Sequence, residues 1–276
     1  MRLSALAAVV ASVLVVTSAT HAATLVAAYT FNGNLNAQQG GVPALAATNP
    51  LGTNAFGTAT VLGSTESVYS FNSSSGNNAG LTFNDGSNLI SPTSYSIEMV
   101  FELGSSENYA SGAWLRLVDS QNRQSDDGLY VNPSSEFAIF PDGSGTPGTL
   151  FSPNTYFDLI LTDDGTTASV YINGTFDFSV ANQGAGLNQL NLSNANNPNQ
   201  LLNLFLDNTV AGGQGEFTSG QIALFEAFNG VLSSSDVATL AADPYANASP
   251  GNTPEPGTWV LLTAGGALLA FRKRRA

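Results

Sequence analysis

Two acidic residues and an asparagine border a glycine-rich loop late in the chain, and they are the best candidates for metal chemistry. Asp207 and Asn208 precede the glycines of residues 212–215, and Glu216 follows them. Calcium prefers hard oxygen ligands, and a flexible loop lets such ligands adjust to its variable geometry. Asp207, Asn208 and Glu216 therefore predict a calcium site. The alternative is a solvated loop whose acids only keep it polar.

The side chains that most often carry nucleophilic or transition-metal chemistry are absent from the central part of the chain. The sequence has no cysteine, and its single histidine, His21, lies near the N-terminus. Residues 23–253 hold nineteen acids and only two bases, Arg116 and Arg123, a formal charge of about −17. Thiol, zinc and lysine Schiff-base chemistry are thereby excluded. Nucleic acid is not expected as a partner, because phosphate contacts need many Lys and Arg side chains.

A polysaccharide-active hydrolase or lyase would need two carboxylates about 5–10 Å apart. Glu98 and Glu102 share one face of a predicted strand, but four residues of strand separate them by roughly 13 Å. Glu226 has no acidic neighbour two positions away. The sequence therefore predicts a domain that is not an enzyme, and a hydrolase or lyase is the alternative.

The C-terminal end of the chain combines three features in a fixed order. The triplet Pro254, Glu255 and Pro256 comes first, an apolar run over residues 257–271 follows, and four consecutive basic residues come last. Basic residues of this kind stay on the cytoplasmic side of a membrane. About fifteen apolar residues make a helix of roughly 22 Å, against a hydrocarbon core of about 30 Å. The run therefore predicts a short transmembrane helix that holds the protein in the inner membrane transiently.

This order resembles the PEP-CTERM sorting signal of Gram-negative bacteria that make exopolysaccharide, and residues 254–276 are assigned to it. In that family the tail is cut near the triplet by an exosortase, a membrane transpeptidase-like enzyme. The resemblance implies an exosortase as partner, and a final location at the cell surface or in the extracellular matrix. An ordinary tail anchor is the alternative.

The N-terminal residues 1–22 predict a secretory signal peptide. They hold one charge, Arg2, then an apolar run over residues 6–16, and they end on the small residue Ala22. With both ends assigned to targeting, one domain is expected over residues 23–243, and a linker rich in Pro, Asn and Ala over residues 244–253.

Most of the central segment reads as short strands. The clearest alternation runs from Ser94 to Leu103, where every second residue is a large apolar one. The opposite face of this strand, which includes Glu98, is expected to meet solvent. Residues 156–180 predict a three-stranded antiparallel meander, in which an Asn-Gly turn joins the last two strands. Residues 234–242 predict the one helix, with a capping box at its start.

Many short strands and one late helix predict an all-β, antiparallel two-sheet sandwich. The order of the elements resembles the laminin-G-like, concanavalin A-like jelly roll in four places: residues 25–34, 94–98, 156–174 and 217–237. Members of this fold often bind calcium at the edge of the sandwich, so the resemblance implies calcium as the only cofactor.

These features together predict an exported, exosortase-processed protein of the cell surface or exopolysaccharide matrix. Its jelly-roll domain is expected to bind an exopolysaccharide or another glycan without catalysis, with calcium as a candidate requirement. A purely structural matrix protein that binds nothing specific is the other alternative.

Overall fold

The structure is a computed structural model. It describes the following residues: 23–86, 88–105, 109, 112–141, 143–144, 148–181, 190–210 and 215–248. The predicted signal peptide, the triplet Pro254–Glu255–Pro256 and the apolar run that follows it lie outside these residues. Within the described part of the chain, no helix is long and apolar enough to cross a membrane.

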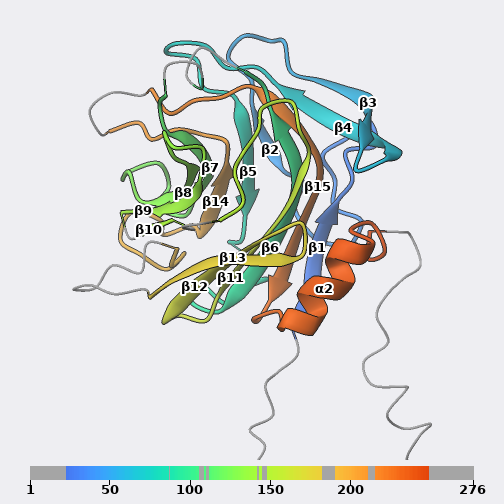
Figure 1. Ribbon diagram of the computed structural model, residues 1–276, viewed down its shortest axis with the longest axis vertical. Helices are drawn as coiled ribbons and strands as arrows, with labels where there is room; N and C mark the ends of the chain where they lie inside the picture. The colour runs from blue at the N-terminus through green and yellow to red at the C-terminus, as the bar shows by residue number, and fades with distance from the viewer. Residues whose placement is uncertain are drawn as a thin grey trace, which may run out of the picture.

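Two antiparallel sheets face each other across an apolar core (Figure 1). The first, which we call sheet A, has eight strands among the described residues. Seven of them follow one another in space as β13 (Thr175–Ala181), β12 (Thr167–Ile172), β11 (Phe157–Asp163), β6 (Tyr95–Leu103), β15 (Gly220–Asn229), β4 (Ser64–Phe71) and β3 (Ala55–Val61). The eighth, β1 (Thr24–Tyr29), pairs with the second half of β15, whereas β4 pairs with its first half.

The second sheet, sheet B, has seven strands in the described residues. Their order in space is β10 (Gly143–Ser144), β9 (Phe137–Phe140), β8 (Gly128–Val131), β7 (Leu115–Asp119), β14 (Leu201–Leu204), β5 (Gly80–Asn84) and β2 (Ala46–Thr48). All strand pairings among the described residues are antiparallel, and the only long regular helix among these residues is α2 (Ser234–Ala242). The predicted all-β, two-sheet sandwich with one short C-terminal helix is confirmed.

The core forms where the alternating apolar residues of the two sheets meet. On β6, Ile97, Met99 and Phe101 are fully buried, as the alternation predicts. Aromatic pairs join the layers: the rings of Phe71 and Phe205 stack with their centroids 4.3 Å apart. Each such side chain contributes about 1.5–3 kcal/mol by its burial, so this shared core fixes how the two sheets sit on each other.

The meander of β11, β12 and β13 forms as predicted, and its second turn is built by its sequence. Asn173 and Gly174 both have positive φ, 51° and 75°, which matches the twist of a two-residue hairpin. A Cβ atom on Gly174 would lie 2.6 Å from the Cβ of Ala241 in α2. The glycine therefore serves both the turn and the close approach of the helix.

Helix α2 lies on the outer face of sheet A, close to β1 and β15 (Figure 1). The Ser233 hydroxyl accepts a hydrogen bond from the backbone of Asp236, whose carboxylate accepts one from the Ser233 backbone, so the predicted capping box is present. Val237 and Leu240 are buried against Phe228 of β15. The helix thus covers the end of the sheet at which β15 terminates.

The outer face of β6 does not meet solvent, so that prediction is wrong. Glu98 on this face is 0% exposed, and Val100 is also fully buried. The reason is a long-range contact: Tyr245 and Ala248 pack against the apolar side chains around Val100. We call residues 243–248 the C-terminal strap. The first residues of the predicted linker thus lie against sheet A.

Candidate functional site

The structure brings the three predicted calcium ligands together beside sheet B. One oxygen of the Asp207 carboxylate accepts a hydrogen bond from the backbone N–H of Glu216 at 3.0 Å. The other accepts one from the backbone N–H of Asn208 at 2.7 Å. The side-chain amide of Asn208 donates to a carboxylate oxygen of Asp126 at 2.6 Å. Asp126 therefore lies beside the three predicted calcium ligands, although the prediction did not include it.

A buried arginine on β7 is the centre of this region. Arg116 Nη1 lies 3.2 Å from Asp119 Oδ1, and Nη2 lies 3.5 Å from Glu216 Oε2. Both terminal nitrogens donate to the carbonyl oxygen of Ser125 at 3.1 Å. Nη2 also donates to the Tyr130 hydroxyl, and the guanidinium carbon lies 4.8 Å from the centre of the Tyr130 ring. We call Arg116, Asp119, Tyr130 and Glu216 the arginine cluster.

The charges of the arginine cluster depend on one another. Burial lowers the pKa of Arg116, but Tyr130, Asp119 and Glu216 together raise it above its ordinary value, so the guanidinium stays charged. Burial raises the pKa of Glu216 to about 7, although Arg116 acts to lower it. Burial also raises the pKa of Asp119, and Arg116 partly offsets this. Arg116 is therefore the charge that lets these acids ionise inside the protein.

The oxygens that calcium would need already have partners. Glu216 Oε2 lies 2.9 Å from the Tyr130 hydroxyl and is paired with Arg116, and both Asp207 oxygens accept backbone hydrogen bonds. Calcium requires about 6–8 oxygen ligands. Across the described ranges, no group of three or more Asp, Glu or His side chains is arranged to hold a metal ion. This geometry favours a structural role for the acids, as counter-charges and hydrogen-bond partners around Arg116. Calcium binding at Asp207, Asn208 and Glu216 stays a prediction.

Arg116 is the residue of this site that the sequence reasoning missed. It stands between Leu115 and Leu117 in a strand whose five residues are all buried. A charged residue almost never becomes fully buried unless it is paired. A lone arginine inside a short apolar strand of an acidic domain was therefore a usable signal for an ion-pair cluster.

A polar cavity of about 470 Å³ lies at the end of the sandwich where β4 and β6 finish and β11 and β15 begin. Its lining contains no charged side chain and consists of Ser73, Ser74, Gly104, Ser105, Asn154, Phe217 and Ser219. Hydrogen bonds between the loops fix its walls. The backbone N–H of Ser73 donates to Ser219 Oγ at 2.9 Å, and that of Gly104 donates to the Ser219 carbonyl oxygen at 2.9 Å.

The polar cavity offers hydrogen-bonding groups and one apolar wall. Asn154 is exposed, and its side-chain amide makes no hydrogen bond to any residue that the structure describes. Phe217 is 6% exposed and supplies an aromatic surface. An amide and several hydroxyls can donate to and accept from a hydroxylated ligand. No lining side chain can act as a general acid or base near neutral pH.

Three buried carboxyl groups lie side by side on the outer face of sheet A, and we call them the carboxyl cluster. Glu98 on β6 stands directly opposite Glu226 on β15. Asp158 on β11 is diagonal to Glu98, because Asp158 pairs with Val100. The sequence reasoning missed this group because it considered acids along one strand, whereas these meet across three strands.

The carboxyl cluster is closed to substrate. Its three side chains are between 0% and 2% exposed. Burial raises the pKa of Asp158 to about 6 and that of Glu226 to about 8. Burial, followed by the charges of Asp158 and Glu226, raises the pKa of Glu98 well above its ordinary value. Burial therefore disfavours the ionised form of all three acids.

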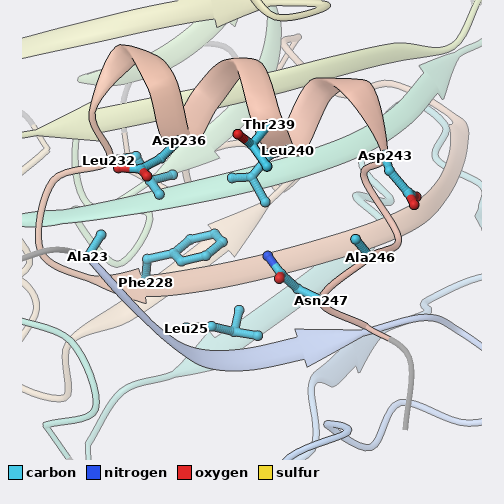
Figure 2. Close-up of a pocket in the computed structure, with 10 residues that line it drawn as sticks. All are labelled: Ala23, Leu25, Phe228, Leu232, Asp236, Thr239, Leu240, Asp243, Ala246 and Asn247. Carbon is cyan, nitrogen blue, oxygen red and sulfur yellow. The ribbon is translucent and has the colours of Figure 1, made fainter. Parts of the chain in front are cut away.

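A smaller cavity of about 200 Å³ lies under α2, between the helix, β1 and β15 (Figure 2). The side chains of Leu25, Phe228 and Leu240 point into it from these three elements. Asp236, which also lines the cavity, already takes part in the capping box at the start of α2. Thr239, Asp243 and Asn247 also line it, so its wall is partly polar.

Residues 252–275 match the model of the PEP-CTERM protein-sorting motif. The protein carries a PEP-CTERM sorting signal. This signal indicates export and a surface or extracellular location in a Gram-negative bacterium, and it implies processing by an exosortase. The prediction made from Pro254, Glu255 and Pro256 is therefore confirmed as a sorting motif. No curated protein sequence matches the chain.

Solved structures share the sandwich at low sequence identity. Domain 4 of the extracellular arabinanase AbnA from Geobacillus stearothermophilus, solved with arabinotriose, aligns at 18% identity and a TM-score of 0.53. The alignment covers 80% of this chain and 99% of that domain. The binding domain of Paraclostridial Mosquitocidal Protein 1 aligns at 13% identity and a TM-score of 0.54, over 81% of this chain and 53% of that one.

A structure of botulinum neurotoxin type C, which needs two ganglioside molecules to enter cells, aligns at 12% identity and a TM-score of 0.54. The alignment covers 79% of this chain and 51% of the neurotoxin chain. The chain thus spans about half the length of the toxin structures it matches. At these identities the likeness shows a fold, the β-sandwich, that binding domains use.

Proposed function

We propose that this protein is a non-catalytic glycan-binding module, displayed at the cell surface or in the exopolysaccharide matrix after an exosortase removes its tail. The observation that carries the proposal is the polar cavity. Ligand sites pair an apolar surface with a few placed polar groups, and here Phe217 is combined with Asn154 and serine hydroxyls. Such a lining suits a neutral sugar.

The negative charge of the domain favours neutral over acidic glycans as ligands. The segment between the two targeting ends carries a formal charge of about −17, which repels acidic polysaccharides at a distance. No basic side chain lines the polar cavity to offset this. A neutral glycan is therefore the proposed ligand, and the arabinotriose complex of the AbnA domain supports the fold as a carrier of such sites.

The absence of catalysis is part of the proposal. Glycoside hydrolysis commonly uses two carboxylates placed on either side of the bond that breaks. The polar cavity has no carboxylate in its lining. The three carboxyl groups that meet on sheet A, Glu98, Asp158 and Glu226, are buried beneath the strap. Turnover of a polysaccharide that is lost in a Glu98→Gln or Glu226→Gln variant would contradict the proposal.

Replacing Asn154 by alanine is expected to weaken glycan binding about tenfold, since a lost ligand hydrogen bond costs about 1–1.5 kcal/mol. The measurement is a glycan array, followed by titration calorimetry with the neutral glycan that binds best. Asn199→Ala is the matched control, because Asn199 is also exposed but lies in the loop before β14. Its affinity should equal that of the wild type.

The array is run with calcium and with a chelator, so that it also tests the predicted requirement for calcium. Binding lost in the chelator, and lost again in Asp207→Asn, would support a calcium ion at Asp207, Asn208 and Glu216. No binding under either condition would remove the glycan-binding proposal and leave a purely structural matrix protein. Equal loss in Asn154→Ala and Asn199→Ala would place the ligand elsewhere.

The mature protein isolated from its own host is expected to end near Pro254–Pro256, because the sorting signal at residues 252–275 implies cleavage there. Intact-mass spectrometry measures this end directly. Loss of the apolar run and the basic tail is the expected result. A chain that retains Arg275 throughout its life in the inner membrane would instead show an ordinary tail anchor.

A further inference from the structure

The carboxyl cluster has no positive partner among the described residues. All six carboxyl oxygens of Glu98, Asp158 and Glu226 are buried, and none of them makes a hydrogen bond to a described residue. The only bases in the described ranges, Arg116 and Arg123, belong to sheet B and its loops. A buried carboxylate with neither a cation nor a hydrogen bond is costly. Burial of this cluster therefore favours the protonated acids.

The strap is what closes the cluster from outside. The chain turns back at the end of α2 and runs past β15 through Asp243, Ala246 and Asn247 (Figure 2). Ala248 is 4% exposed and packs against Val100 and Leu224 on the outer face of sheet A. Two local hydrogen bonds hold the strap itself, from Ala246 N–H to the Asp243 carbonyl oxygen at 3.1 Å and from Ala248 N–H to that of Tyr245 at 3.2 Å.

We propose that the carboxyl cluster is a proton-dependent clamp, which keeps the strap on sheet A while its acids are protonated and releases it when they ionise. A carboxylate buried without a cation is costly, and a second charge beside it adds repulsion. Water can reach the ionised acids only if a covering element moves. The strap is the cover without regular secondary structure, whereas the strands beneath it are paired with neighbouring strands of sheet A.

The other titratable groups around the carboxyl cluster, the strap and α2 also favour release of the strap when the acids ionise. They come from β4, β6, β12, the segment before β11, α2 and the strap: Glu66, Glu102, Tyr171, Tyr156, Asp236, Asp243 and Tyr245. Each is an acid or a phenol, so none supplies a compensating positive charge. The Tyr245 hydroxyl is buried without a hydrogen bond to a described residue, and burial, followed by the charge of Glu66, raises its pKa. The apolar contacts of Tyr245 and Ala248 thus hold the strap on sheet A.

The raised pKa values place the response between mildly acidic and mildly alkaline pH. Asp158 has a pKa of about 6 and Glu226 one of about 8. The strap precedes the matched sorting motif at residues 252–275. Opening the clamp thus changes how the tail that carries this motif leaves the domain, independently of whether the polar cavity binds a glycan.

The test is hydrogen–deuterium exchange of the full-length chain in a mild detergent, read at peptides that contain residues 243–248. After correction for the pH dependence of intrinsic exchange, strap exchange is expected to rise at least tenfold between pH 6 and pH 9. One proton lost on opening gives up to about tenfold for each pH unit. The Glu98→Gln, Asp158→Asn, Glu226→Gln triple variant should change less than twofold over this range.

Glu102→Gln is the matched control, because Glu102 lies on the same face of β6 but is only partly buried. It should keep the wild-type response. If the triple variant does not fold, Glu226→Gln alone should reduce the rise, since it leaves one acid fewer to ionise beneath the strap. Exchange that is flat with pH in the wild type, a rise that persists in the variants, or a rise that calcium abolishes would each overturn the clamp.

Discussion

Replacing Arg116 by methionine is expected to lower the free energy of unfolding by about 3–5 kcal/mol, because it leaves buried carboxylates without their counter-ion. Arg116 and Asp119 are both 0% exposed, and Glu216 depends on the same guanidinium. Methionine keeps much of the apolar length of the side chain but removes the charge and its hydrogen bonds. Urea unfolding at neutral pH, followed by tryptophan fluorescence, measures the loss.

Arg123→Met is the control for Arg116→Met. Arg123 is only partly buried, and its Nε donates to the Asp207 carbonyl oxygen at 2.6 Å. Its loss should cost about 1–2 kcal/mol, as for one charge-assisted hydrogen bond. The triple variant Arg116→Met, Asp119→Asn, Glu216→Gln should recover most of the stability, since removing a whole buried ion network is often close to neutral. A single Arg116→Met variant within 1 kcal/mol of the wild type would contradict this account.

Stability is expected to fall as pH rises from about 4 to about 8, the opposite of a domain stabilised by ionised acids. The native pKa values of Asp158 and Glu226 are raised to about 6 and about 8, chiefly by burial. The native state therefore binds more protons than the unfolded chain over this range. Their contribution is fully present below pH 4 and is lost as pH passes through the native pKa values. Each excess proton contributes up to about 1.4 kcal/mol per pH unit.

Urea unfolding at a series of pH values measures this slope, and the carboxyl cluster can be separated from the other raised acids. Glu216 and Asp85 also have raised pKa values, about 7 and about 6, chiefly because of burial. The Glu98→Gln, Asp158→Asn, Glu226→Gln variant should therefore keep part of the slope and lose the part above pH 7. Stability that increases between pH 5 and pH 8 would show that the cluster is ionised in the native state.

The strands in which apolar and polar residues alternate cleanly could be predicted from the sequence. The strands without this alternation could not be predicted. β6 and the meander were expected at nearly their observed bounds, because one face of each is apolar. Strand β3 was missed: it lies at the end of sheet A and pairs with β4, and most of its residues are exposed. An edge strand of this kind shows no alternation of buried and exposed residues. Its sequence alone therefore does not indicate that it pairs with β4.

The candidate sites, too, could be predicted from the sequence only in part. Asp207, Asn208 and Glu216 were expected together, since they border one loop. Their partner Arg116 was not expected, because the contact joins strand β7 to the segment between β14 and β15, far along the chain. Glu98 was assigned to solvent, since only the strap, well over a hundred residues further along the chain, decides that it is buried. Local pattern predicts which face a residue occupies, but not what covers that face.

The strap lies between α2 and the sorting motif at residues 252–275, so its position sets how much chain joins the sandwich to that motif. An extended residue covers about 3.3–3.6 Å, so the six residues of the strap span about 20 Å when they leave sheet A. Release of the strap would therefore lengthen the connection between the domain and its sorting signal by about 20 Å, and would give a processing enzyme more room beside the sandwich.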